Sequence, residues 1–140
     1  MALSADRDYE TSGLTEKIRV LLTASVTYYK GGMVQFDATT GRAKKAAADV
    51  AGEFGIGVLV KAAVVPASPD VYAEVEVGKI WIPFAAAAQG DVGDWVYCSD
   101  DGTITKTPLT NGGPCGLVLD FKTGYLLVDF RRGGPKTLSA

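Results

Sequence analysis

Two stretches of this chain share one pattern, GMVQFDATTGRA at residues 32–43 and GDWVYCSDDGTI at residues 93–104. Gly32 and Gly41 recur 61 residues later as Gly93 and Gly102. In both stretches, a short run of strand-forming residues meets a polar turn that contains glycine, and a return segment follows. This arrangement is typical of a β-hairpin, so the chain is predicted to form two similar hairpins.

The similarity continues beyond the hairpins. Residues 55–60 (GIGVLV) resemble residues 114–119 (PCGLVL), and residues 72–77 (YAEVEV) resemble residues 125–130 (YLLVDF). A duplicated set of short strands separated by glycine turns is typical of small barrels and sandwiches. We therefore expect an all-β fold, a small β-barrel or sandwich with two pseudo-repeated halves, an extended N-terminal arm and little helix.

Single elements follow from local patterns. Strands are expected at residues 18–22, 33–36, 42–46, 57–65, 71–77, 78–84, 95–98, 103–107, 116–121 and 125–130. The alanine run at 85–88 and the segment 44–53 are too short for a stable helix, so each is expected to be a loop or one helical turn. The predicted organisation is an arm at 1–16, a β domain at 17–131 and a polar tail at 132–140.

Composition excludes several classes of function. A net charge of −2 gives no basic excess for binding nucleic acid. The absence of histidine removes histidine-based triads and most zinc sites. The first twelve residues have no apolar core and no window approaches a membrane span, so we expect no signal peptide, no membrane partner and a soluble protein made in the cytoplasm.

Two cysteines and several acidic residues are the candidates for chemical sites. Cys98 and Cys115 could form a disulfide or remain buried thiols, and the sequence leaves both open, with thiols favoured. Four aspartates are expected to stabilise turns and not to bind calcium, because the EF-hand spacing is absent. They are Asp91, Asp94, Asp100 and Asp101. Glu74 and Glu76 are expected on a solvated strand face rather than in a hydrolase pair. We therefore expect no catalytic residue, no metal, no cofactor and no enzymatic activity.

One region resembles a known family. The segments concerned are 77–84 (VGKIWIPF), 88–97 (AQGDVGDWVY), 101–104 (DGTI) and 115–119 (CGLVL). Over about residues 30–130 the chain resembles the capsid decoration, or cement, proteins of tailed phages. The resemblance implies a virion protein on the exterior of an expanded icosahedral capsid, made in the bacterial cytoplasm. It also implies contacts with the major capsid protein and with copies of itself, as a trimer in preference to a dimer.

Candidate contact residues follow from exposure and residue type, because aromatic side chains are enriched at interfaces and a polar arm can order on binding. They are Asp6, Arg7, Tyr9, Leu14, Tyr28, Tyr29, Pro66, Pro69 and Trp81. Deletion of residues 2–16 is expected to weaken capsid attachment and to leave the fold intact. Two alternatives stay open: a virion fibre or tail adaptor, and a small β-barrel ligand-binding module or enzyme with a concave pocket.

Overall fold

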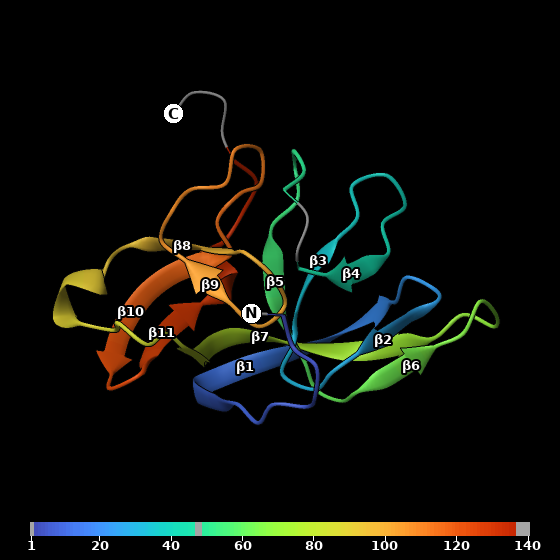
Figure 1. Ribbon diagram of the computed structural model, residues 1–140, viewed down its shortest axis with the longest axis horizontal. Helices are drawn as coiled ribbons and strands as arrows, with labels where there is room; N and C mark the ends of the chain where they lie inside the picture. The colour runs from blue at the N-terminus through green and yellow to red at the C-terminus, as the bar shows by residue number, and fades with distance from the viewer. Residues whose placement is uncertain (1, 47–48, 137–140) are drawn as a thin grey trace.

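The protein is described by a computed structural model covering residues 2–46 and 49–136, and it is nearly all β. Figure 1 shows the arrangement of its strands. The elements are β1 (Glu10–Leu21), β2 (Val26–Tyr28), β3 (Met33–Phe36), β4 (Ala43–Lys45), β5 (Gly55–Leu59), β6 (Ala63–Val65), β7 (Tyr72–Pro83), η1 (Gln89–Asp91), β8 (Trp95–Cys98), β9 (Ile104–Thr105), β10 (Gly116–Lys122), β11 (Tyr125–Asp129) and η2 (Phe130–Arg132). Within the described residues, no helix is long and apolar enough to cross a membrane.

The two halves of the chain have the same strand topology. In the first half, β3 pairs with β4 and β5, and β5 pairs with β7. In the second half, β8 pairs with β9 and β10, and β10 pairs with β11. Antiparallel pairing of β7 with β11 joins the halves into the order β4-β3-β5-β7-β11-β10-β8-β9. The prediction of an all-β fold with two pseudo-repeated halves is confirmed.

β7 is the strand at which the sheet divides. At Val75 its partners are Ile18 of β1 and Leu59 of β5, whereas at Trp81 they are Glu10 of β1 and Leu127 of β11. Both β5 and β11 therefore lie along the edge of β7 opposite β1, and the sheet curls into a half-barrel.

The structure corrects two predicted strand boundaries. Residues 71–77 and 78–84 were expected to form two strands, but β7 runs through Gly78, whose φ of +149° fits glycine. The expected strand at 57–65 is divided into β5 and β6, and β6 leaves the main sheet to pair with β2. The residues between the two strands mark the division, because Lys61 and Ala62 are exposed whereas Leu59 and Val65 on either side are buried.

The expected N-terminal arm is instead part of the fold. β1 begins at Glu10, eight residues before the predicted strand, and pairs with β7 along its length. The sequence pattern does not predict the first part of β1, because this edge strand is mostly polar and has few buried side chains. The preceding segment is also held, because the Arg7 amide donates to the Lys30 carbonyl at 2.9 Å and the Arg7 guanidinium donates to the Gly102 carbonyl at 2.7 Å.

At the other end of the chain, the part of the predicted tail that the structure describes is also in contact with the domain. The Gly134 amide donates to the Pro114 carbonyl at 3.1 Å. The Lys136 ammonium donates to the carbonyls of Leu109 and Thr110 at 3.0 and 3.1 Å. The remainder of the predicted tail, 137–140, lies outside the described residues.

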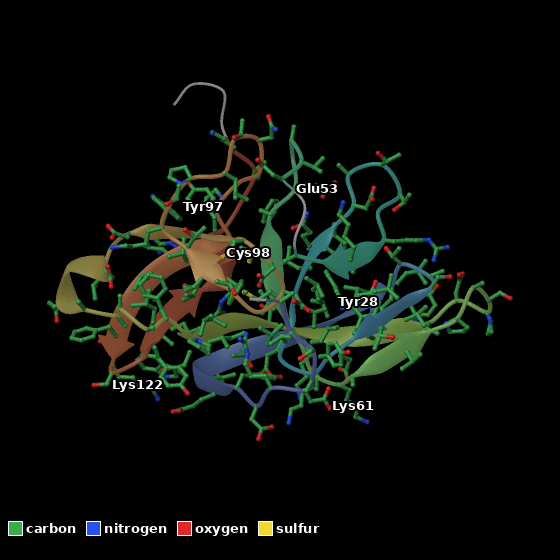
Figure 2. All side chains as sticks on the ribbon, viewed as in Figure 1. Tyr28, Glu53, Lys61, Tyr97, Cys98 and Lys122 are labelled. Carbon is green, nitrogen blue, oxygen red and sulfur yellow. The ribbon has the colours of Figure 1, made fainter. Side chains whose placement is uncertain are left out.

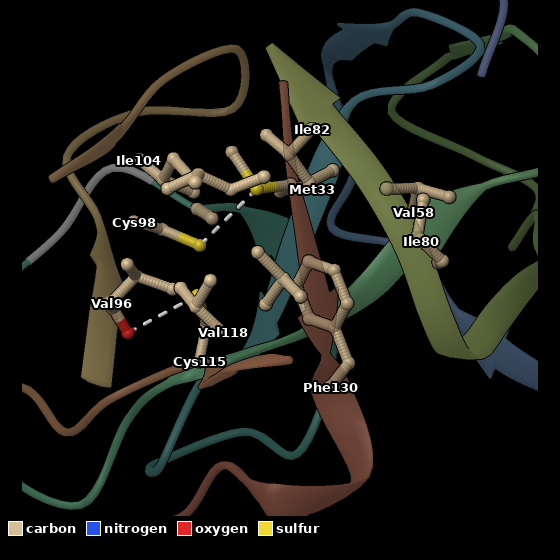
Figure 3. Packing of buried hydrophobic residues seen from close by; sticks show 13 residues of the cluster. Met33, Val58, Ile80, Ile82, Val96, Cys98, Ile104, Cys115, Val118 and Phe130 are labelled. Carbon is tan, nitrogen blue, oxygen red and sulfur yellow. Dashed lines mark hydrogen bonds between the residues drawn. The ribbon is translucent and has the colours of Figure 1, made fainter. Parts of the chain in front are cut away.

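The buried side chains form two clusters. The first is drawn in Figure 3 and includes Met33, Ile80, Val118 and Phe130. The second contains Val34 and other residues of the first half, namely Val20, Leu22, Tyr28, Ala43, Ile56, Leu59, Val65 and Val75. Because Met33 belongs to one cluster and Val34 to the other, both faces of β3 are covered.

Both cysteines are free thiols buried in the first cluster. Cys98 Sγ lies 3.5 Å from Met33 Sδ, and Cys115 Sγ lies 3.4 Å from the Val96 carbonyl oxygen (Figure 3). The hydrogen bond with Cys115 and burial together raise the pKa of Cys98 well above its usual value. Of the two alternatives left open by the sequence, the structure has the buried thiols.

Candidate functional site

The sequence-predicted contact residues Tyr9 and Trp81 meet in one hollow of about 300 Å³. We call it the Trp81 groove, and it is lined by Asp8, Tyr9, Glu10, Trp81, Lys122 and Tyr125. The registers of β1, β7 and β11 place Glu10 beside Trp81 and Trp81 beside Leu127. Two residues further along β7 and β11, Tyr125 pairs with both Lys122 and Pro83. Strand pairing therefore brings together side chains that are far apart in sequence.

The ammonium group of Lys122 lies within the groove, against its aromatic rings. Its Nζ atom lies 4.5 Å from the ring centroid of Trp81 and 5.3 Å from that of Tyr125. The same atom forms an ion pair with Glu10 at 2.9 Å. An exposed cation–π contact contributes only about 0.5–1 kcal/mol, and an exposed ion pair no more. The groove thus holds a cation against aromatic faces by contacts weak enough to exchange. Figure 2 labels Lys122, at the end of the β10–β11 hairpin.

Tyr9 connects the groove to a buried carboxylate, that of Glu76. The hydroxyl of Tyr9 donates to Glu76 Oε1 at 2.6 Å, and the Thr15 hydroxyl donates to Oε2. Burial favours a raised pKa for Glu76, but these two hydrogen bonds and the charge of Lys17 outweigh it and lower the pKa. Glu76 was predicted on a solvated face, and that prediction is wrong, because β1 and Tyr9 cover it. Glu74, two residues earlier, is exposed as predicted.

The other predicted contact residues are dispersed. Asp6 is exposed and accepts a hydrogen bond from the Lys30 amide at 3.1 Å. Leu14 is 87% exposed, at the register shift in β1. Pro66 and Pro69 are exposed in the β6–β7 loop, at the end of the molecule away from the β10–β11 hairpin (Figure 1).

Of the two adjacent tyrosines, the structure excludes one as a surface contact. Tyr28 is 1% exposed, and its hydroxyl donates to the Thr23 carbonyl at 3.1 Å, so its assignment to an interface is wrong. A tyrosine on the core side of a short strand supplies apolar area and still satisfies its hydroxyl. Tyr29 is half-buried, with Lys45 Nζ 5.1 Å from its ring centroid.

Four groove residues are absent from the sequence-predicted contact set, namely Asp8, Glu10, Lys122 and Tyr125. The sequence assigns Asp8 and Glu10 to the arm, and Lys122 and Tyr125 to a turn and a strand without a contact role. The predicted hairpin at 122–124 would have paired Lys122 with Tyr125, so that pair was within reach of sequence reasoning. The pairing of β11 with β7, which brings Trp81 to them, has no local signal.

The four aspartates considered for calcium have partners within the protein: Asp94 Oδ2 lies 3.9 Å from Lys106 Nζ, and the other three accept hydrogen bonds. Asp100 Oδ1 accepts from the Gly102 amide at 2.9 Å, as turn chemistry predicts. Asp91 accepts from the Ala88 amide and pairs with Lys106, and Asp101 accepts from the Leu3 amide. Across residues 2–46 and 49–136, no group of three or more acidic residues or cysteines is arranged to hold a metal ion.

A further hollow, of about 370 Å³, lies where β1 meets β7 at the end of β5. Its most prominent contact is Arg19, whose guanidinium carbon lies 3.8 Å from the ring centroid of Tyr72. Lys61 and Glu74 also line it. This hollow and the Trp81 groove both combine an aromatic ring with a cation, which suits binding by stacking and charge rather than proton transfer.

Comparison of the chain with protein-family models, curated proteins and solved structures found no match.

Proposed function

We propose that this protein is a structural component of a phage virion, which binds the outside of an icosahedral capsid and clamps neighbouring major capsid subunits. It acts by binding and catalyses no reaction. The proposal starts from the resemblance of residues 30–130 to capsid decoration proteins. Its partners are the major capsid protein and further copies of this chain, with a trimer preferred over a dimer.

The observation that carries the proposal is the Trp81 groove. Tryptophan, tyrosine and arginine dominate the binding energy of protein interfaces, mostly in pockets that a partner closes. Trp81 and Tyr125 form such a hollow on a sheet stiffened by antiparallel pairing on both sides of β7. A cationic side chain of the capsid protein would replace Lys122 on the aromatic faces and pair with Glu10. Many weak sites of this kind, repeated on a lattice, give a stable coat through multivalency.

Co-sedimentation with expanded phage heads stripped of this protein tests the proposal. Saturation at many copies spread over the shell supports decoration, whereas a few copies confined to the vertices favour a fibre or adaptor. No binding by a folded protein overturns the capsid proposal.

Two variants and a control then locate the contact. Tyr125→Ala and Glu10→Lys alter the groove at exposed positions, and each is expected to weaken binding at least tenfold, because the first removes an aromatic face and the second removes the carboxylate with which the capsid cation would pair. Val64→Ala removes a side chain that is 77% exposed on β6, outside the groove, and should bind normally. Equal binding by all three variants would remove the groove from the interface.

A further inference from the structure

β8 differs from its counterpart β3 in having one uncovered face. Val96 and Cys98 point into the first cluster, and the alternation of a strand turns Trp95 and Tyr97 to the other face. Trp95 is 46% exposed, although its counterpart in the repeat, Val34, is completely buried. Residues two apart on a strand are separated by about 7 Å, so the two rings lie side by side. Tyr97 and Cys98, both labelled in Figure 2, are adjacent, and of the two only Cys98 is buried.

These rings belong to a hollow of about 430 Å³. We call it the Trp95 platform, and it is lined by Asp94, Trp95, Tyr97, Lys106 and Pro108. It is an open hollow that combines two aromatic side chains with a few polar groups, the residue types that orient small-molecule ligands.

The polar groups are at the rim. Lys106 Nζ pairs with Asp91 at 2.5 Å and lies 3.9 Å from Asp94 Oδ2. The Asp94 and Lys106 side chains are 46% and 44% exposed, so each can still bond to a ligand. Two carboxylates against one ammonium leave a net charge of −1 here, which disfavours an anionic ligand.

We propose that the Trp95 platform binds a neutral oligosaccharide. A sugar ring has an apolar face of C–H groups, which packs on an aromatic ring, and a rim of hydroxyls. Asp94 would accept hydrogen bonds from those hydroxyls, and Lys106 would donate to them. Nucleobases also stack on aromatic side chains, but their phosphates would meet the carboxylates of Asp91 and Asp94.

A soluble sugar is proposed in place of a protein partner because the platform combines an exposed aromatic ring with exposed hydrogen-bonding groups. The Trp81 groove offers no free ring face of this kind, because Lys122 already lies over the Trp81 ring. The inference concerns the free chain and does not depend on capsid attachment.

Intrinsic fluorescence gives a direct test, because Trp81 and Trp95 are the only tryptophans. In the full chain carrying Trp81→Phe, titration with an array of neutral oligosaccharides should give a saturable change for at least one glycan. That glycan, measured by calorimetry, should bind at least tenfold more weakly to Trp95→Ala and several-fold more weakly to Asp94→Ala. Tyr125→Ala, outside the platform, should bind it unchanged.

Three results would overturn the proposal. They are no saturable binding to any neutral glycan, binding that survives Trp95→Ala, and binding confined to anionic glycans or oligonucleotides. Protection of Trp95 from fluorescence quenching by phage heads, with no glycan bound, would assign the platform to a protein interface instead. Asp94→Ala removes a half-exposed side chain, so it keeps the test decisive even if Trp95→Ala fails to fold.

Discussion

Gly57 and Gly116 make the same contact in the two halves of the fold. A Cβ atom at Gly57 would overlap the backbone carbonyl oxygen of Glu76, and one at Gly116 would overlap that of Asp129. Gly57 matches Gly116 in the repeat, and Glu76 matches Asp129. One glycine therefore brings together the backbones of β5 and β7 in the first half and of β10 and β11 in the second, so the duplication extends from sequence to packing.

Alanine at either glycine should destabilise the protein. Because the clash is with backbone atoms, the strands must move apart, and we expect Gly57→Ala and Gly116→Ala each to lower the free energy of unfolding by about 2 kcal/mol or more. Gly90 has no atom within 4 Å of a built Cβ and needs no positive φ, so Gly90→Ala is the control and should change stability by less than about 0.5 kcal/mol. Urea denaturation measures all three. Equal stabilities would contradict the close-contact explanation.

What the sequence could predict depended on which interactions are local. The hairpins were predicted from their turns, and β3 and β8 have the expected boundaries of 33–36 and 95–98. β1 was largely missed, since an edge strand with polar side chains shows no apolar alternation. Its register against β7 is set by the tertiary fold.

The candidate site shows the same division. Trp81 was singled out because Ile80 and Ile82 point to the other side, and those two are indeed buried at 0% and 1%. Its neighbours Lys122 and Tyr125 come from strands whose order in the sheet no local pattern specifies. The matched positions Val34 and Trp95 differ in burial although the strand topology is the same. The second buried cluster covers Val34, whereas Trp95 is 46% exposed.

The buried carboxylate of Glu53 should contribute to the stability of the fold. It is 4% exposed, accepts from Gln35 Nε2 at 2.7 Å and the Ala38 amide at 2.9 Å, and pairs with Lys44 at 2.8 Å. Removing it leaves these donors without that acceptor, so Glu53→Ala should lower the free energy of unfolding by about 2–4 kcal/mol. Asp70→Asn, which alters an exposed pair with Arg42, should cost less than about 1 kcal/mol. Similar losses in thermal or urea unfolding would refute the distinction.

Stability should depend on the ionisation of Glu76. Its folded-state pKa is lowered, so its contribution is present above the unfolded value of about 4.3 and is lost as the pH falls through the folded value. Wild type should therefore exceed Glu76→Gln in unfolding free energy at pH 7, and the difference should shrink as the medium becomes more acidic than pH 4. Glu74→Gln, an exposed change on the same strand, is the control. A difference that does not vary with pH would show that the charge of Glu76 is not involved.

The two cysteines should react only when the protein unfolds. Both are 5% exposed or less, and the pKa of Cys98 is raised, so little thiolate is available to a disulfide reagent. We expect modification to follow the rate of opening and to become rapid in denaturant. Leu14→Cys introduces a thiol at an 87% exposed position and should react at once. Rapid native-state labelling of both natural cysteines would contradict their burial.

The N-terminal segment should stabilise the fold itself. The Arg7 guanidinium donates to the carbonyls of Gly31 and Gly102, at 3.4 and 2.7 Å, and so links turns that belong to different halves. Arg7→Ala should lower the free energy of unfolding by about 1–3 kcal/mol, because hydrogen bonds from a charged donor are lost. The control is Asp8→Ala, whose side chain is 95% exposed in its pair with Lys30, and it should leave the melting temperature unchanged.

This result bears on how capsid attachment is tested. Deletion of residues 2–16 also removes more than half of β1. With it go the pairs that β1 makes with the part of β7 between Val77 and Trp81. We therefore expect that deletion to unfold or strongly destabilise the protein, contrary to the sequence-based expectation. A stable deletion variant, with an unchanged melting temperature and β-rich circular dichroism, would show that the segment is dispensable for folding. Loss of head binding by that variant would then assign the segment to the capsid contact.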